Sequence, residues 1–232
     1  MMKKINTLFA LCMLCFGSVS SADAAPVYQD KKCKEIMQEH PVEFDITYDF
    51  GNLEYDRSKT AQEIESIFVK NNQKAHENGK VQGLTILKGY YKLSAIIASE
   101  KMRGLYSCYY PTKITLHLGY KDSVMYIAKE LKEKTCEYER TLRHEYTHLR
   151  FGYLGLAMQV MTAQNNMQNL INDIGPLATI KKKELAETEL IKKYENRFLS
   201  VYQAIEQIIK DQNAKIDTLE NYTEESKLCK SI

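Results

Sequence analysis

The sequence predicts an α+β fold, in which an antiparallel or mixed sheet packs on a helix with a His-Glu-x-x-His motif and a long C-terminal helical hairpin follows. In the first half of the chain, apolar and polar residues alternate in short runs, the periodicity of half-buried strands. From about residue 135 onward, apolar residues recur every three to four positions, as on one face of a helix. No internal repeat or low-complexity linker divides these halves. We therefore expect one domain over residues 25–232, with a helical half over about 135–215.

Residues 1–24 have the pattern of a signal peptide. Lys3 and Lys4 precede an apolar run over residues 8–19, and small residues follow, with cleavage expected after Ala24. The run is short for a membrane anchor. A lipid-modified cysteine fits less well, because each of the two cysteines in the run follows a leucine. We expect a periplasmic or secreted protein with no stable membrane span once the signal is removed.

The strands of the first half are expected before residue 131. Residues 42–50 alternate strictly between apolar and polar side chains, and a helix over about 60–77 follows. Residues 94–99 also fit a helix. The junction at 119–123 has the character of a hairpin turn, so the strands on either side of it are expected to pair antiparallel. The remaining strands are predicted over residues 84–97, 106–110, 113–120 and 123–130.

Two long helices are expected in the second half. The first begins after Thr135, a residue type that caps helix N-termini, and must end at Gly175-Pro176 because proline cannot continue a helix. The second runs from about residue 179 to beyond 210. Helices joined by so short a break should fold back antiparallel.

Four cysteines remain after signal removal, and an even number in an exported protein indicates two disulfides. None of them has the close spacing of a cysteine-ligated zinc site. Three pairings are possible. We favour Cys108–Cys136, which would tie a strand to the start of the motif helix, together with Cys33–Cys229, which would join the two ends of the domain.

The chain is close to electrically neutral, which argues against nucleic acid as the main partner. The formal net charge of the whole chain is +2, and removing Lys3, Lys4 and Asp23 with the signal peptide lowers it to +1. The chain has no phosphate-binding loop and no serine nucleophile elbow.

The most informative motif is His144-Glu145-Tyr146-Thr147-His148. Because residues four apart lie on the same face of a helix, the two imidazoles can converge on one metal ion. Glu145 points about 100° away from His144 and can hold a water beside that ion. A metal-activated water with a carboxylate base is the chemistry of zinc hydrolases.

In this segment the chain resembles the zincin superfamily of metallopeptidases, over about residues 114–150, and also predicted secreted zinc-dependent proteases of unassigned substrate. The resemblance implies Zn²⁺ held by His144 and His148. It also implies that Glu145 is the general base, which later hands its proton to the leaving amine. The chain departs from the metzincin pattern, because no Gly-x-x-His follows the motif, and this leaves the third ligand open.

For the third ligand the sequence offers three candidates. In zincins whose third ligand is a glutamate, that residue comes from a downstream helix. Glu187 lies within the apolar stripe of the second long helix, where a buried carboxylate usually has a partner or a metal. The other interpretation is that the stripe begins later and Glu187 is solvated. Glu195 at the edge of the stripe and Glu130 on the preceding strand are the alternatives.

A helical wheel raises a difficulty for the candidates on the second helix. The apolar seam of the motif helix lies opposite His144 and His148, so a helix packed on that seam is on the wrong side for ligation. A bend at Gly152 or Gly155 would remove the difficulty.

Together these features predict an exported zinc metallopeptidase that hydrolyses a peptide or protein substrate. The alternative is a catalytically inactive zincin-like protein that binds a partner or self-associates through its long C-terminal helix. A purely structural exported domain, in which the histidines are incidental, is the third possibility.

Overall fold

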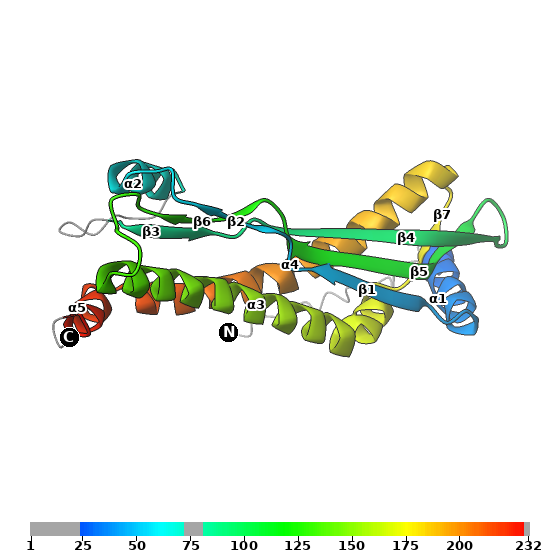
Figure 1. Ribbon diagram of the computed structural model, residues 1–232. Coiled ribbons are helices and arrows are strands. Elements are labelled where there is room, and N and C mark those ends of the chain that lie inside the picture. The colour runs from blue at the N-terminus through cyan, green and yellow to red at the C-terminus, as the bar shows by residue number, and fades with distance from the viewer. Residues whose placement is uncertain (1–23, 72–80, 230–232) are drawn as a thin grey trace, which may run out of the picture.

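The computed structural model describes residues 24–71 and 81–229, and it confirms an α+β fold (Figure 1). The predicted signal peptide lies outside the described residues except for Ala24. Among the helices of the described ranges, none combines the length and apolarity needed to cross a membrane. In chain order the elements are α1 (Ala24–Glu39), β1 (Glu43–Asp49), β2 (Leu53–Asp56), α2 (Ala61–Lys70), β3 (Gly83–Ile86), β4 (Gly89–Lys101), β5 (Ser107–Tyr120), β6 (Ser123–Ile127), α3 (Cys136–Ile174), β7 (Leu177–Thr179), α4 (Lys183–Ile216) and α5 (Leu219–Lys227).

The strands form two small mixed sheets that continue into one another. The first has the order β1-β5-β4, with β7 pairing the start of β5, and the second has the order β2-β6-β3. Glu43 pairs with Lys113 in the first sheet and Leu53 with Ser123 in the second, so the parallel register has the same offset in both. The sheets are therefore two halves of one ribbon, bent where Gly51 and Asp122 adopt positive φ angles of 68° and 52°.

The hairpin predicted at residues 119–123 is wrong, because β5 and β6 do not pair. At the bend the chain continues from β5 in the first sheet into β6 in the second sheet without reversing its direction. The antiparallel partner of β6 is β3, and that of β5 is β4. Residues 94–99 belong to β4. Residues 106–110 and 113–120 share one strand, in which Pro111 lies at a register shift that accommodates its missing N–H.

The long helices follow the sequence pattern closely. The Thr135 side chain accepts a hydrogen bond from the Tyr138 backbone N–H at the start of α3, and Gly175 ends the helix with a φ of 65°. The next helix, α4, begins at Lys183, because residues 177–179 first pair with β5 as β7. Neither α1 nor α5 was anticipated.

Two apolar cores lie along the molecule, and α3 spans both (Figure 1). The larger core packs the first sheet against α1, α4 and the second half of α3. In that half of the helix Leu156, Val160, Ala163 and Met167, which recur every three to four positions, are buried. The smaller core packs the second sheet against α2 and the first half of α3. In that half, β3 packs on the helix face that carries Glu145.

All four predicted cysteines form disulfides, but the predicted pairing is wrong. Cys33 on α1 is bonded to Cys108 on β5, and Cys136 at the start of α3 is bonded to Cys229 just after α5. The unanticipated helices explain the error. Because α1 packs against β5 and β7, it brings Cys33 to Cys108, while α5 returns to the first turn of α3.

Candidate metal centre

The approach of α4 to α3 determines where the site forms. Gly155 of α3 faces the Ile209 side chain of α4 so closely that a Cβ at this position would lie 2.0 Å from Ile209 Cδ1. Gly152 gives the same close approach to Leu87, just after β3. The two glycines bring α4 and β3 to the motif face of α3. The end of α4 and the start of α5 therefore reach the imidazoles, which resolves the difficulty posed by the helical wheel.

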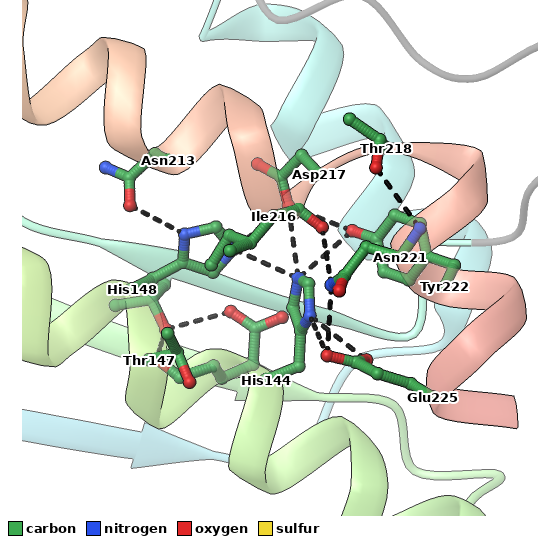
Figure 2. A network of polar contacts seen from close by, with 12 residues as sticks. His144, Thr147, His148, Asn213, Ile216, Asp217, Thr218, Asn221, Tyr222 and Glu225 are labelled. Atoms are coloured by element: carbon green, nitrogen blue, oxygen red, sulfur yellow. Dashed lines mark hydrogen bonds and ion pairs between the residues drawn. The ribbon is translucent and has the colours of Figure 1, made fainter.

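His144, His148 and Asp217 converge at the end of α4 (Figure 2). The two Nε2 atoms lie 3.1 Å apart. Asp217 Oδ1 lies 3.1 Å from Nε2 of His144 and 3.0 Å from Nε2 of His148. These atoms form a nearly equilateral triangle. Each of them offers a lone pair to a cation.

The opposite ring nitrogens are engaged elsewhere. Nδ1 of His148 lies 2.9 Å from the Asn213 side-chain oxygen, and Nδ1 of His144 lies 3.4 Å and 3.3 Å from the two Glu225 carboxylate oxygens. When Nδ1–H donates to these acceptors, a neutral imidazole presents an unprotonated Nε2. Two such nitrogens and a carboxylate oxygen, about 3 Å apart, need a proton or a metal ion between them.

The electrostatics of the cluster favour positive charge at its centre. Burial lowers the pKa of His148, but hydrogen bonding to Asp217 and the charge of Glu145 outweigh it and raise this pKa to about 9. The pKa of His144 is also raised, because Asp217 and Glu145 outweigh its burial. Burial favours the neutral form of Asp217, yet the two imidazoles hold its pKa well below the usual range.

Glu145 is buried on the β3 side of the same helix turns. The Thr85 hydroxyl donates a hydrogen bond of 2.9 Å to its carboxylate. Burial raises the pKa of Glu145, and the neighbouring imidazoles oppose the rise. Gly83 leaves the room that Glu145 occupies, since a Cβ there would lie 2.6 Å from Oε1. His144, Glu145 and His148 place one ligand atom each within 4.8 Å of one another, a group that could hold a metal ion.

Tyr222 of α5 completes the cluster. Its hydroxyl donates to Asp217 Oδ1 at 3.0 Å and lies 3.2 Å from Nε2 of His144. Burial and the nearby charge of Asp217 raise the pKa of this phenol, so it stays protonated at neutral pH. Its one proton, which Asp217 accepts in this structure, can be donated instead to an anionic ligand beside it.

These groups open onto a cavity of about 530 Å³. Three regions line the cavity: β3 with the residues on either side of it, the first half of α3, and the end of α4 with α5. The edge of β3 that does not pair with β6 belongs to the first of these regions, since β3 is the last strand of its sheet. The cavity therefore has polar groups at its centre and, along its side, an edge of β3 with which no other strand of residues 24–71 and 81–229 pairs.

The structure brings none of the three predicted third ligands to the imidazoles. Glu187 forms an ion pair with Lys183 on its own helix, Glu195 lies midway along α4, and Glu130 accepts hydrogen bonds from the first backbone N–H of α2. None of these lines the cavity. The carboxylate that contacts Nε2 of both histidines is that of Asp217.

Asp217 and Tyr222 were not anticipated from the sequence. The signal that could have found Asp217 is helix length: α3 and α4 have 39 and 34 residues, so an antiparallel return brings the last turns of α4 to the half of α3 that carries the histidines. Thr218 is the N-cap of α5, a residue type that marks the end of α4 and the start of a new helix.

No protein-family model, curated protein or solved structure matches the chain. The chemistry of the site is therefore inferred from its own residues.

Proposed function

We propose that this protein is an exported zinc-dependent metallopeptidase. His144, His148 and Asp217 hold the metal, and Glu145 is the general base. The observation that carries the proposal is the convergence of two Nε2 atoms and a carboxylate oxygen within 3.1 Å of one another, with both Nδ1 atoms turned to oxygen acceptors.

The donor set and its spacing are those of a zinc site, and zinc is the metal that the hydrolytic proposal requires. Zinc binds imidazole and carboxylate at about 2.0–2.1 Å in tetrahedral geometry, which places two ligand atoms roughly 3.3 Å apart. The three donor atoms of the triangle lie 3.0–3.1 Å apart, within a small adjustment of that spacing. Three protein ligands beside a cavity are the arrangement of catalytic rather than structural zinc sites.

The side chains around the triangle supply the remaining chemistry. When bound, zinc would lower the pKa of a water and polarise a carbonyl group. Glu145, whose pKa burial raises, can accept a proton from a water in the cavity and return it to the leaving amine. The Tyr222 hydroxyl can donate a hydrogen bond to the oxyanion that develops on the attacked carbonyl.

A peptide fits the strand edge that lines the cavity. An extended peptide can add to the edge of β3 that is unpaired within the described part of the chain, through backbone hydrogen bonds that do not depend on the peptide's sequence. Its backbone would then run past Glu145, which lies against Gly83 of that strand. This placement supports a peptide or protein substrate.

Metal content and activity of three proteins test the proposal. We expect about one zinc ion per chain in the wild type and in Glu145→Gln, but far less in His144→Ala. Glu145→Gln should lose hydrolysis of a broad peptide library by about 100-fold or more, because it removes the base but keeps the ligands. Glu139→Gln, an exposed change on the same helix, is the matched control. A wild-type protein that binds no zinc would overturn the proposal.

A second candidate is a zincin-like binding protein without catalysis. It is favoured by apolar side chains on the outer face of α3, where Leu154 is 52% and Met161 is 60% exposed. A protein that binds zinc but cleaves no member of the peptide library would support this candidate.

A further inference from the structure

The shortest helix of the site is α5, which has nine residues and no buried side chain. Isolated helices of this length are marginal in water. Its position next to α3 therefore depends on contacts that it makes with the rest of the protein. The covalent contact is the Cys136–Cys229 disulfide, which joins the first residue of α3 to the chain just after α5.

Glu225 of α5 contacts Nδ1 of His144, the ring nitrogen opposite the Nε2 atom that would bind the metal. Its two carboxylate oxygens lie 3.4 Å and 3.3 Å from Nδ1 of His144. Asn221, one turn earlier, donates a hydrogen bond of 3.1 Å to the same carboxylate and another of 2.9 Å to the Ile216 backbone oxygen. Figure 2 shows Glu225 and Asp217 on opposite sides of the His144 ring. An acceptor on Nδ1 fixes the ring orientation and directs Nε2 toward the metal.

We propose that Glu225 is a positioning residue for the metal ligand His144, and that the Cys136–Cys229 disulfide holds it in place. This inference rests on the metal site of the proposed function. The disulfide thereby couples the redox state of the protein to its affinity for zinc: the oxidised chain has the fully oriented site, and the reduced chain releases α5 from the first turn of α3.

The two disulfides differ in how well a reductant can reach them. Cys33 and Cys108 are both 0% exposed, whereas Cys136 and Cys229 are half-buried. A small dithiol should therefore reduce Cys136–Cys229 first. One thiolate of the reductant attacks a sulfur to form a mixed disulfide, and its second thiol then displaces the cysteine. The protein gains two electrons and two protons as two thiols, and the reductant becomes a cyclic disulfide.

Zinc affinity of variants on α5 tests the role of Glu225. Glu225→Ala should bind zinc about 10- to 100-fold more weakly than the wild type, the usual effect of losing such an acceptor. Glu225→Gln should keep most of the affinity, because its amide oxygen can still accept from Nδ1. Glu224→Ala is the matched control, since Glu224 is 61% exposed and pairs with Lys227. Equal affinity of Glu225→Ala and the wild type would overturn the assignment.

A double-mutant cycle tests the link to the disulfide. Cys136→Ser/Cys229→Ser should also lose about 10- to 100-fold in zinc affinity, and adding Glu225→Ala should weaken it little further, because the two changes remove the same interaction. Mild dithiol treatment of the wild type, with thiols located by alkylation, should reproduce the loss without any substitution. Circular dichroism of each metal-free variant monitors folding.

The outcomes separate this inference from the proposed function. If the oxidised wild type binds no zinc, the metal site itself is wrong. If the wild type binds zinc and the Cys136→Ser/Cys229→Ser protein binds it equally well, the metal site stands and the coupling to the disulfide is wrong. Additive losses in the double-mutant cycle would also contradict the coupling.

Discussion

Asp217 and His148 are 69 positions apart in sequence, yet the aspartate Oδ1 lies 3.0 Å from Nε2 of the imidazole. The same oxygen lies 3.1 Å from Nε2 of His144. One carboxylate oxygen thus faces both histidines of the motif. This shared contact makes Asp217 the residue on which the proposed metal site can be tested most directly.

Replacing Asp217 by asparagine should weaken zinc binding by 100-fold or more, roughly 3 kcal/mol, because the amide is uncharged and a poorer ligand. Glu187→Gln should leave the affinity unchanged, since Glu187 pairs with Lys183 away from the cavity. Competition with a chromophoric chelator measures both variants. A loss in Glu187→Gln with none in Asp217→Asn would restore the ligand first predicted from the sequence.

Removing the metal should lower thermal stability. A ligand present at about 1,000 times its Kd stabilises the folded state by about 4 kcal/mol, which corresponds to roughly 10 °C in Tm for a domain of this size. A chelator should therefore lower the Tm of the wild type and leave that of His144→Ala/His148→Ala unchanged. Calorimetry with and without chelator measures the difference. An equal effect on both proteins would place the metal elsewhere.

Gly155→Ala should destabilise the protein by about 1 kcal/mol, because overpacking against Ile209 exceeds the gain in helix propensity. It should also weaken zinc binding by moving α4 away from the histidines. Adding Ile209→Val removes the Cδ1 atom that the new methyl group meets, and it should recover part of both losses. Chemical denaturation and zinc titration test this, and no recovery would show that the close approach is not the cause.

Alkaline pH should destabilise the fold through buried tyrosines. Burial and the neighbouring Glu206 raise the pKa of Tyr202 to about 12 from its ordinary value of 10.0. Because this pKa is raised in the folded state, its contribution is intact below pH 10 and is lost as the pH rises toward 12. Between pH 10 and pH 12 the free energy of unfolding should fall by roughly 1 kcal/mol less in Tyr202→Phe than in the wild type, as measured by urea denaturation. Parallel curves for the two proteins would contradict this.

The parts of the fold and of the site that depend on neighbouring residues in the sequence could be predicted from it. The strict alternation over residues 42–50 corresponds to β1, and Thr135 and Gly175 bound α3 as expected, because caps and breaks act on their immediate neighbours. The convergence of His144 and His148 also follows from helix geometry, since one turn separates them.

The contact of Asp217 with the histidines and the disulfide pairing depended on tertiary arrangement. Asp217 lies between two helices on a polar stretch, and only the return of α4 along α3 gives it a special position. Cys33 lies in α1 and Cys229 lies just after α5, two helices that no strong periodicity marked, so the partners of these cysteines could not be chosen by spacing. Residues 119–123 have the composition of a turn, which is the same for a bend within a strand pair and for a hairpin. The bend forms here because β1 pairs with β5 and β2 pairs with β6, so that both segments of the chain continue past it side by side.

The length of α3 has a consequence for the whole molecule. Because its 39 residues contribute side chains to both apolar cores, neither core can melt without disrupting the helix that the other needs. The protein should therefore denature as a single cooperative unit. A substitution that destabilises the larger core, far from the histidines, should then also destabilise the site, because α3 is a single helix shared by both.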